Sequence, residues 1–288
     1  MSAAPTPDCQ LSNLSESLLF SFTGDGITSR QPVSIAVYAG KPGSGISFLS
    51  NKASSISSQS STCEVIIPAR SDFVVNTVRN VVLGAQGVRL CFVEHLLAAA
   101  ALWGADDLLI YVDGPEIPLE DGSASFWIKL FEQSELPKRL PQPAFALKES
   151  IVIAKGNKQI IANPADQFSI TYLMDWQHPA IGKRWASWNA QEPIDAIASA
   201  RTFGLQSEQE MLGLDDNFVS LTESGFSKPL RHEDEPVRHK LLDLLGDLSL
   251  CGVNPLSIKA QFISIRAGHE LDVQMAARLQ NILRPVKS

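Results

Sequence analysis

A histidine and two aspartates recur four residues apart in the stretch 237–248, Val-Arg-His-Lys-Leu-Leu-Asp-Leu-Leu-Gly-Asp-Leu. A helical reading places His239, Asp243 and Asp247 on one face, because side chains four residues apart lie on the same side of a helix. The leucines of the stretch form the opposite, apolar face. His239 and Asp243 are therefore spaced to bind one cation. Alone, the pattern equally fits a solvent-exposed polar face with an ordinary histidine–aspartate pair.

Glu94-His95 opens a second segment, 93–104, which is rich in alanine and leucine and ends at Gly104. A histidine at such a position often serves only as a hydrogen-bonded core residue. Here, if His95 binds a metal, the neighbouring Glu94 carboxylate is placed to take a proton from a water molecule on that metal. With His239 and Asp243 this makes three ligands and an open position, the ligand count of a hydrolytic zinc site; Fe²⁺ also suits such a set.

Composition narrows the class of protein. The chain has 288 residues, 44% hydrophobic and 19% charged, which predicts a globular protein of one large or two ordinary domains. A formal charge of −7 gives no basic footprint, so we expect no nucleic-acid polymer as a partner. The four cysteines lack the spacing of a disulfide framework or a thiolate zinc site, which favours a reducing compartment, the cytoplasm. The N-terminus resembles no secretory signal, and no apolar run approaches the ~20 residues of a membrane span.

The order of the expected elements predicts an α+β fold. Each half gives several strands, a buried helix, another strand and a closing helix, which indicates two domains of like architecture. The proposed division is a flexible leader 1–17, a first domain 18–135, a Pro-rich linker 136–145 and a second domain 146–288.

Strands are predicted at 18–22, 33–38, 78–83, 88–92, 107–113, 146–154, 158–163, 167–175 and 258–265. Helices are predicted at 93–103, 124–131, 237–251 and 270–283, with Asp234 as a candidate cap and Pro236 near the start of the third. The segments 40–45 and 54–62 are expected to be loops.

Several motifs in this order resemble those of the UDP-3-O-acyl-N-acetylglucosamine deacetylase family. They are Val93-Glu-His-Leu-Leu-Ala-Ala99, Asp113-Gly-Pro-Glu-Ile-Pro118, Asp121-Gly-Ser-Ala124, His178-Pro-Ala-Ile181, Ala200-Arg-Thr-Phe-Gly204, Val237-Arg-His-Lys-Leu-Leu-Asp243, Gly246-Asp-Leu248 and Gly268-His269. The similarity runs from about residue 18 to 283. It implies the committed step in the synthesis of lipid A, part of the lipopolysaccharide of the Gram-negative outer membrane. It also implies two β-sheet-and-helix domains in a β-α-α-β sandwich with zinc between them.

The resemblance also assigns roles, position by position. His95, His239 and Asp243 would bind zinc, and Glu94 would be the general base that activates the attacking water. His269, paired with Asp247, would stabilise the oxyanion or protonate the leaving amine. Thr202 would polarise the substrate carbonyl, Lys240 would contact the substrate, and Phe203 would pack on it. The implied substrate is a UDP-linked acylated amino sugar, and we expect a monomer.

Three departures from the family pattern stand out. In Gly24-Asp-Gly-Ile-Thr-Ser-Arg30, Thr28 replaces a histidine and Arg30 a glycine, and Phe92 stands where threonine is usual. The segment 205–236 is shorter than in typical members, and the usual Gly-Ser-x-x-Asn-Ala motif is not recognisable in 212–220; in the family this insert holds the acyl chain. Two other functions therefore stay open: a zinc amidohydrolase acting on a different N-acyl amino sugar, and a non-catalytic sugar-nucleotide-binding relative.

Overall fold

The computed structural model describes residues 17–52, 63–212 and 218–283. The predicted leader, apart from Ser17, and the whole of the serine-rich loop 54–62 lie outside these ranges. The strands of the first half are β1 (Leu18–Asp25), β2 (Pro32–Ala39), β3 (Ile46–Lys52), β4 (Cys63–Pro68), β5 (Val74–Asn76), β6 (Val82–Ala85), β7 (Val88–Cys91) and β8 (Leu108–Asp113). Its helices are α1 (Glu94–Trp103), α2 (Ser125–Gln133) and the short 3₁₀ turn η2 (Ser71–Phe73).

The strands of the second half are β9 (Phe145–Ala146), β10 (Ile151–Lys155), β11 (Lys158–Pro164), β12 (Ser169–Trp176), β13 (Gly182–Asn189), β14 (Phe203–Leu205), β15 (Val219–Thr222), β16 (Gly225–Phe226) and β17 (Ile258–Ile265). The helices are α3 (Asp195–Ala198), α4 (Gln206–Leu212), α5 (Glu235–Leu248) and α6 (His269–Ile282), with 3₁₀ turns η3 (Ser249–Cys251) and η4 (Pro255–Ser257).

Two mixed sheets form the outer layers. The first has the order β1-β2-β8-β3-β4, and the second has β10-β11-β17-β12-β13, with β9 added beside β17. Each contains one parallel pair within this order, β3 with β8 and β12 with β17. Val33, Ile35 and Val37 alternate with more exposed neighbours along β2, so one face of that sheet turns inward. The α+β class is therefore confirmed.

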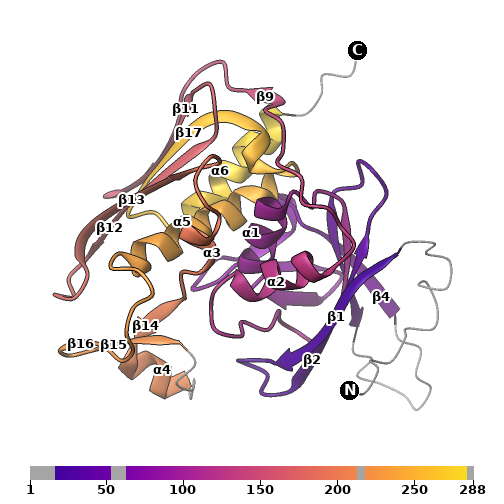
Figure 1. The fold of residues 1–288 in the computed structure, drawn as a ribbon, viewed down its shortest axis with the longest axis horizontal. Coiled ribbons are helices and arrows are strands. Elements are labelled where there is room, and N and C mark those ends of the chain that lie inside the picture. The colour runs from indigo at the N-terminus through magenta and orange to yellow at the C-terminus, as the bar shows by residue number, and fades with distance from the viewer. Residues whose placement is uncertain (1–16, 53–62, 213–217, 284–288) are drawn as a thin grey trace.

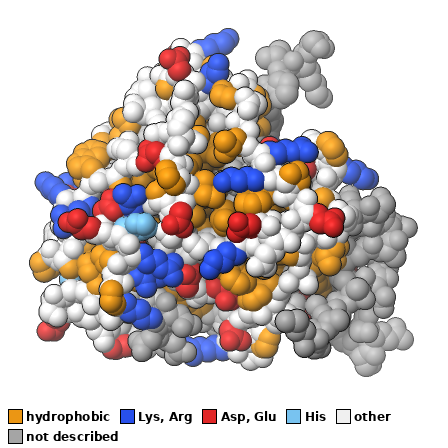
Figure 2. Space-filling view, in the orientation of Figure 1, with side chains coloured by type: hydrophobic (Ala, Val, Ile, Leu, Met, Phe, Trp, Pro, Cys, Tyr) orange, Lys and Arg blue, Asp and Glu red, His pale blue; other side chains and the backbone are white. Residues whose placement is uncertain are grey.

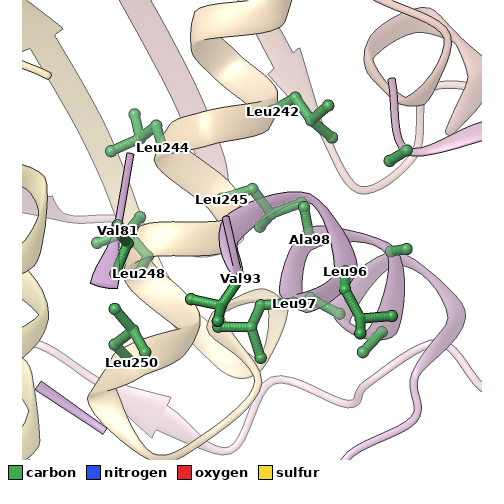
Figure 3. Close-up of a cluster of buried hydrophobic side chains, with 14 of the residues drawn as sticks. Val81, Val93, Leu96, Leu97, Ala98, Leu242, Leu244, Leu245, Leu248 and Leu250 are labelled. Atoms are coloured by element: carbon green, nitrogen blue, oxygen red, sulfur yellow. The ribbon is translucent and has the colours of Figure 1, made fainter. Parts of the chain in front are cut away.

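Helices α1 and α5 meet in the middle of the molecule, where their apolar side chains form one cluster (Figure 3). Leu97 comes from α1 and Val93 directly precedes it, whereas Leu245 and Leu248 come from α5. Helix α2 packs beside α1, and α6 packs beside α5. The layers follow the order sheet, helices, helices, sheet, which is the predicted β-α-α-β sandwich (Figure 1).

The polar face of α5 is buried. His239, Asp243 and Asp247 are 2%, 3% and 0% exposed, so the alternative of a solvent-exposed polar face is wrong. Buried ionisable groups are stable only when paired, hydrogen-bonded or bound to a metal. The helix also begins differently from expectation, because the Asp234 side chain caps no backbone N–H and instead forms an ion pair with Arg238.

Some strand boundaries were wrong. The predicted strand 78–83 begins only at Val82, after Arg79 adopts a left-handed backbone with φ 69°. The predicted strand 146–154 is two short strands, because β9 pairs with β17, β10 pairs with β11, and the residues between them belong to neither strand. Two small sheets, β5-β6-β7 and β14-β15-β16, form separately from the main sheets. The end of α1 at Gly104 is confirmed, with φ 78°.

The segment 136–144 contains no helix or strand, and its backbone is tied to both halves. The Arg139 N–H donates to the Trp103 carbonyl, and the Ala144 N–H donates to the Ser257 carbonyl. A domain boundary at 136–145 stays a prediction. On the face seen in Figure 2, acidic and basic side chains are interspersed. Over the described part of the chain, no helix is both long and apolar enough to cross a membrane.

Candidate metal centre and active site

Helices α1 and α5 bring three potential metal ligands together. The Asp243 Oδ1 atom lies 3.3 Å from His95 Nε2 and 3.3 Å from His239 Nε2. All three side chains are buried, and their ligand atoms lie within 4.8 Å of one another. Ligands at about 2.0–2.1 Å from a tetrahedral zinc ion are themselves about 3.3–3.4 Å apart. The spacing to Asp243 thus fits a divalent cation among the three atoms.

Surrounding groups orient the ligands. The His239 Nδ1 atom faces the Ala200 carbonyl at 3.1 Å; donation by Nδ1 leaves the Nε2 lone pair directed at the cation site. Burial lowers the pKa of His239 to about 4, against the opposing effect of Asp243, so its imidazole is neutral at pH 7. The Lys240 ammonium donates to Asp243 Oδ2 at 2.7 Å, whereas the buried Oδ1 atom has no hydrogen-bond partner. A free carboxylate oxygen beside two imidazole nitrogens suits a cation.

Glu94 is the first residue of α1 and lies next to His95. Its side chain is buried, and its Oε2 atom accepts a hydrogen bond from the Val81 N–H at 3.2 Å. Burial raises the pKa of Glu94 above its usual range, although His269 and His95 oppose this effect. A carboxylate with a raised pKa is a stronger base, which suits proton abstraction from water.

His269 begins α6 and pairs with Asp247 of α5. The distance from His269 Nδ1 to Asp247 Oδ2 is 2.7 Å, and both side chains are buried. Burial alone would lower the pKa of His269, but the Asp247 carboxylate outweighs it and the pKa rises to about 10. The imidazole is therefore a cation near neutral pH, with Nε2 free to donate to another group.

One cavity of about 110 Å³ joins these groups. Its lining contains Glu94, His95, Thr202, Phe203, His239, Lys240, Asp243 and His269. Asp247 does not line the cavity and lies behind His269, to which it is hydrogen-bonded. The structure therefore places every site residue predicted from the sequence at this cavity or directly beneath it.

Four further residues line the cavity without having been assigned from the sequence: Arg79, Phe92, Leu119 and Trp176. Phe92 precedes Val93-Glu94-His95, and that adjacency was a usable signal. Nothing local marked Arg79, whose guanidinium lies 3.5 Å from Glu208 of α4 in the other half of the chain. Trp176 packs against Phe203, with ring centroids 5.2 Å apart, and so forms an aromatic wall.

The altered loop 24–30 is held by a buried carboxylate. Glu116 accepts hydrogen bonds from the Thr28 hydroxyl at 2.8 Å and from the Thr28 and Ser29 N–H groups. Thr28 thus anchors its own loop and does not line the cavity. The segment 205–236, which the resemblance predicts to be a shortened insert, contains α4, β15 and β16, and β15 pairs in parallel with β14. Part of its 212–220 segment, residues 213–217, lies outside the described residues.

Gly246 sets the distance between α1 and α5. A Cβ atom at this position would lie 2.1 Å from the Glu94 backbone oxygen, so the two helices touch through their backbones. We expect Gly246→Ala to push α1 from α5, to separate His95 from His239, and to cost about 1–3 kcal/mol of unfolding free energy. Urea unfolding and metal content measure the two effects. Gly225→Ala is the control, because its Cβ would meet no atom within 4 Å. A fully stable, metal-replete Gly246→Ala protein would contradict this prediction.

Comparisons with known proteins identify the family of the chain. The family model LpxC, described as UDP-3-O-acyl N-acetylglycosamine deacetylase, matches residues 17–281. A UDP-3-O-acyl-N-acetylglucosamine deacetylase from Thermosynechococcus vestitus is 40% identical over 221 residues, covering 73% of this chain and 76% of the relative. A protein of the same name from Myxococcus xanthus is 31% identical over 278 residues, covering 92% of this chain and 85% of the relative. By both the family match and these relatives, the chain belongs to the UDP-3-O-acyl-N-acetylglucosamine deacetylase family.

Proposed function

We propose that this protein hydrolyses the N-acetyl group of UDP-3-O-acyl-N-acetylglucosamine to acetate and a free amine, a step of lipid A biosynthesis. The observation that carries the proposal is the buried His95–His239–Asp243 set, with Glu94 and His269 in the same cavity. The names of the relatives supply the substrate. Zinc is the proposed metal, and Fe²⁺ suits the same donors. The protein is proposed to act in the cytoplasm and as a monomer.

In this proposal His95, His239 and Asp243 hold the metal. When bound, the metal supplies Lewis-acid chemistry, polarising the amide carbonyl and making water more acidic. Glu94 takes a proton from the attacking water. Thr202 donates a hydrogen bond toward the carbonyl oxygen, and His269 stabilises the negative charge that develops there.

The amide bond then breaks as His269 delivers a proton to the departing nitrogen. Asp247 keeps His269 protonated until that moment. Lys240 contacts the substrate from the cavity wall while it fixes Asp243, and Phe203 with Trp176 packs against the apolar part of the sugar.

The charge on His269 predicts a pH effect. Because the protonated form is active and its pKa is raised to about 10, activity limited by His269 is retained at neutral pH and lost only as the pH rises toward 10. Asp247→Asn removes the carboxylate that raises this pKa, while burial still lowers it, so the alkaline limb is expected to move to lower pH. The pH dependence of kcat/KM measures this shift. The control is Asp234→Asn, at the start of the same helix, which should leave the alkaline fall of kcat/KM at the native pH. An unchanged alkaline fall in Asp247→Asn would contradict the role of the His269–Asp247 pair.

The test of the function is acetate release from UDP-3-O-acyl-N-acetylglucosamine by metal-quantified protein, with and without a chelator. We expect release that the chelator abolishes and added zinc restores. Comparing the substrate with its unacylated counterpart then separates this activity from hydrolysis of a different N-acyl amino sugar. Absence of release by fully zinc-loaded protein would overturn the proposal and favour a binding role.

A further inference from the structure

A second buried carboxyl group, Asp272, lies close enough to the His269–Asp247 pair for the charges of both residues to affect its pKa. It lies on α6, three residues after His269, so both side chains project from the same side of that helix. Asp272 is 1% exposed and Asp247 is 0% exposed. The roles described above make no use of Asp272.

Among the described residues, only one of the two carboxyl oxygens of Asp272 has a hydrogen-bond partner. Its Oδ1 atom accepts a hydrogen bond from the Ser264 hydroxyl at 3.5 Å. Ser264 lies opposite Tyr172 on the neighbouring strand, and the side chains of Ser264 and Tyr172 are hydrogen-bonded to each other. Its Oδ2 atom is buried and has no partner. On the neighbouring carboxyl, Asp247 Oδ2 bonds His269, and Oδ1 is buried and has no partner. Each carboxyl therefore leaves one oxygen unsatisfied.

A single proton shared by these two oxygens would satisfy both of them. An ionised carboxylate only accepts hydrogen bonds, whereas a protonated carboxyl carries one donor. A buried acceptor without a donor costs about 1–3 kcal/mol. Burial, reinforced by Asp247, holds the pKa of Asp272 well above its usual range; Asp243 acts in the same direction, whereas His269 and Lys240 oppose it. Tyr172, the remaining titratable neighbour, is buried and has a raised pKa, so it stays neutral.

We propose that Asp272 is a positioning residue for the general acid His269: its neutral carboxyl group donates a hydrogen bond from Oδ2 to the free Oδ1 of Asp247. Asp247 then has two donors, His269 on one oxygen and Asp272 on the other, and its orientation is set. Because the second donor stabilises the negative charge of Asp247, that carboxylate attracts the His269 proton less strongly. His269 thereby releases its proton to the leaving amine more readily.

The inference rests on the proposed role of His269, and its test compares Asp272→Leu with Asp272→Asn in zinc-loaded protein. Leucine removes the donor, so we expect kcat to fall about tenfold or more, with KM and metal content unchanged, and the alkaline limb to move to higher pH. Asparagine keeps a neutral N–H donor, so it should restore kcat to within about threefold of the native value. Proton NMR titration of the His269 ring measures the change in the pKa of His269 independently of turnover.

Three outcomes overturn the proposal: native kcat and pH dependence in Asp272→Leu, failure of Asp272→Asn to restore kcat, or an alkaline limb displaced to lower pH in Asp272→Asn. The last would show that Asp272 is an anion in the native enzyme. If Asp272→Leu does not fold, the asparagine variant alone still decides between a neutral and an anionic Asp272. His269→Ala is measured in parallel, because its full activity would contradict the role of His269 itself rather than that of Asp272.

Discussion

Replacing Glu94 with glutamine is expected to lower kcat for acetate release by about 10²–10⁴-fold, the usual contribution of a general base. Glutamine has nearly the same shape, and its carbonyl oxygen can still accept the hydrogen bond from the Val81 N–H. It cannot take a proton from water. The metal ligands are untouched, so metal content and KM should stay close to native.

The measurement is steady-state acetate release with parallel elemental analysis of the metal. Glu132→Gln is the matched control, since Glu132 is an exposed carboxylate on α2. Near-native turnover in metal-loaded Glu94→Gln would show that another group acts as the base. Loss of metal from this variant would mean that Glu94 holds the site together, and the fall in turnover would then say nothing of proton transfer.

Asp243→Asn is expected to reduce metal affinity by more than about 100-fold, because a direct ligand should matter more than the 10–100-fold effect of an outer partner. The amide carries no negative charge to offset a dication. The change also removes the anionic partner of Lys240, because Lys240 Nζ lies 2.7 Å from Asp243 Oδ2. Acetate release should fall with metal occupancy and recover only in part at high zinc concentration.

Metal content after dialysis and activity against zinc concentration measure this loss. Asp234→Asn is again the control, because Asp234 stands at the start of the same helix and pairs with Arg238 instead of facing the cavity. An Asp243→Asn protein that binds zinc as tightly as the native protein would remove Asp243 from the ligand set.

Local sequence was sufficient to predict α1 and α5 and to mark the candidate ligands that they carry. The spacing of His239 and Asp243 and the adjacent Glu94-His95 pair can be read without a structure, because a helix has a constant period. The burial of the polar face of α5 could not be read in this way. Polar residues at helical spacing usually face solvent, and the packing of α1, α6 and the second sheet against α5 excludes solvent here.

The sequence by itself determined the α+β class, the main helices and most long strands, because these depend on periodicity. Its motifs, through their resemblance to the deacetylase family, indicated the candidate site residues. Tertiary structure decided the distances between the candidate site residues. His95 and His239 are far apart in the chain, and their approach depends on Gly246, whose missing side chain lets the α5 backbone reach Glu94. It also decided that Arg79 and Trp176 share the cavity and that Asp247 and Asp272 each bury an unsatisfied oxygen. Such contacts join residues distant in sequence, and no local pattern encodes which of them will meet.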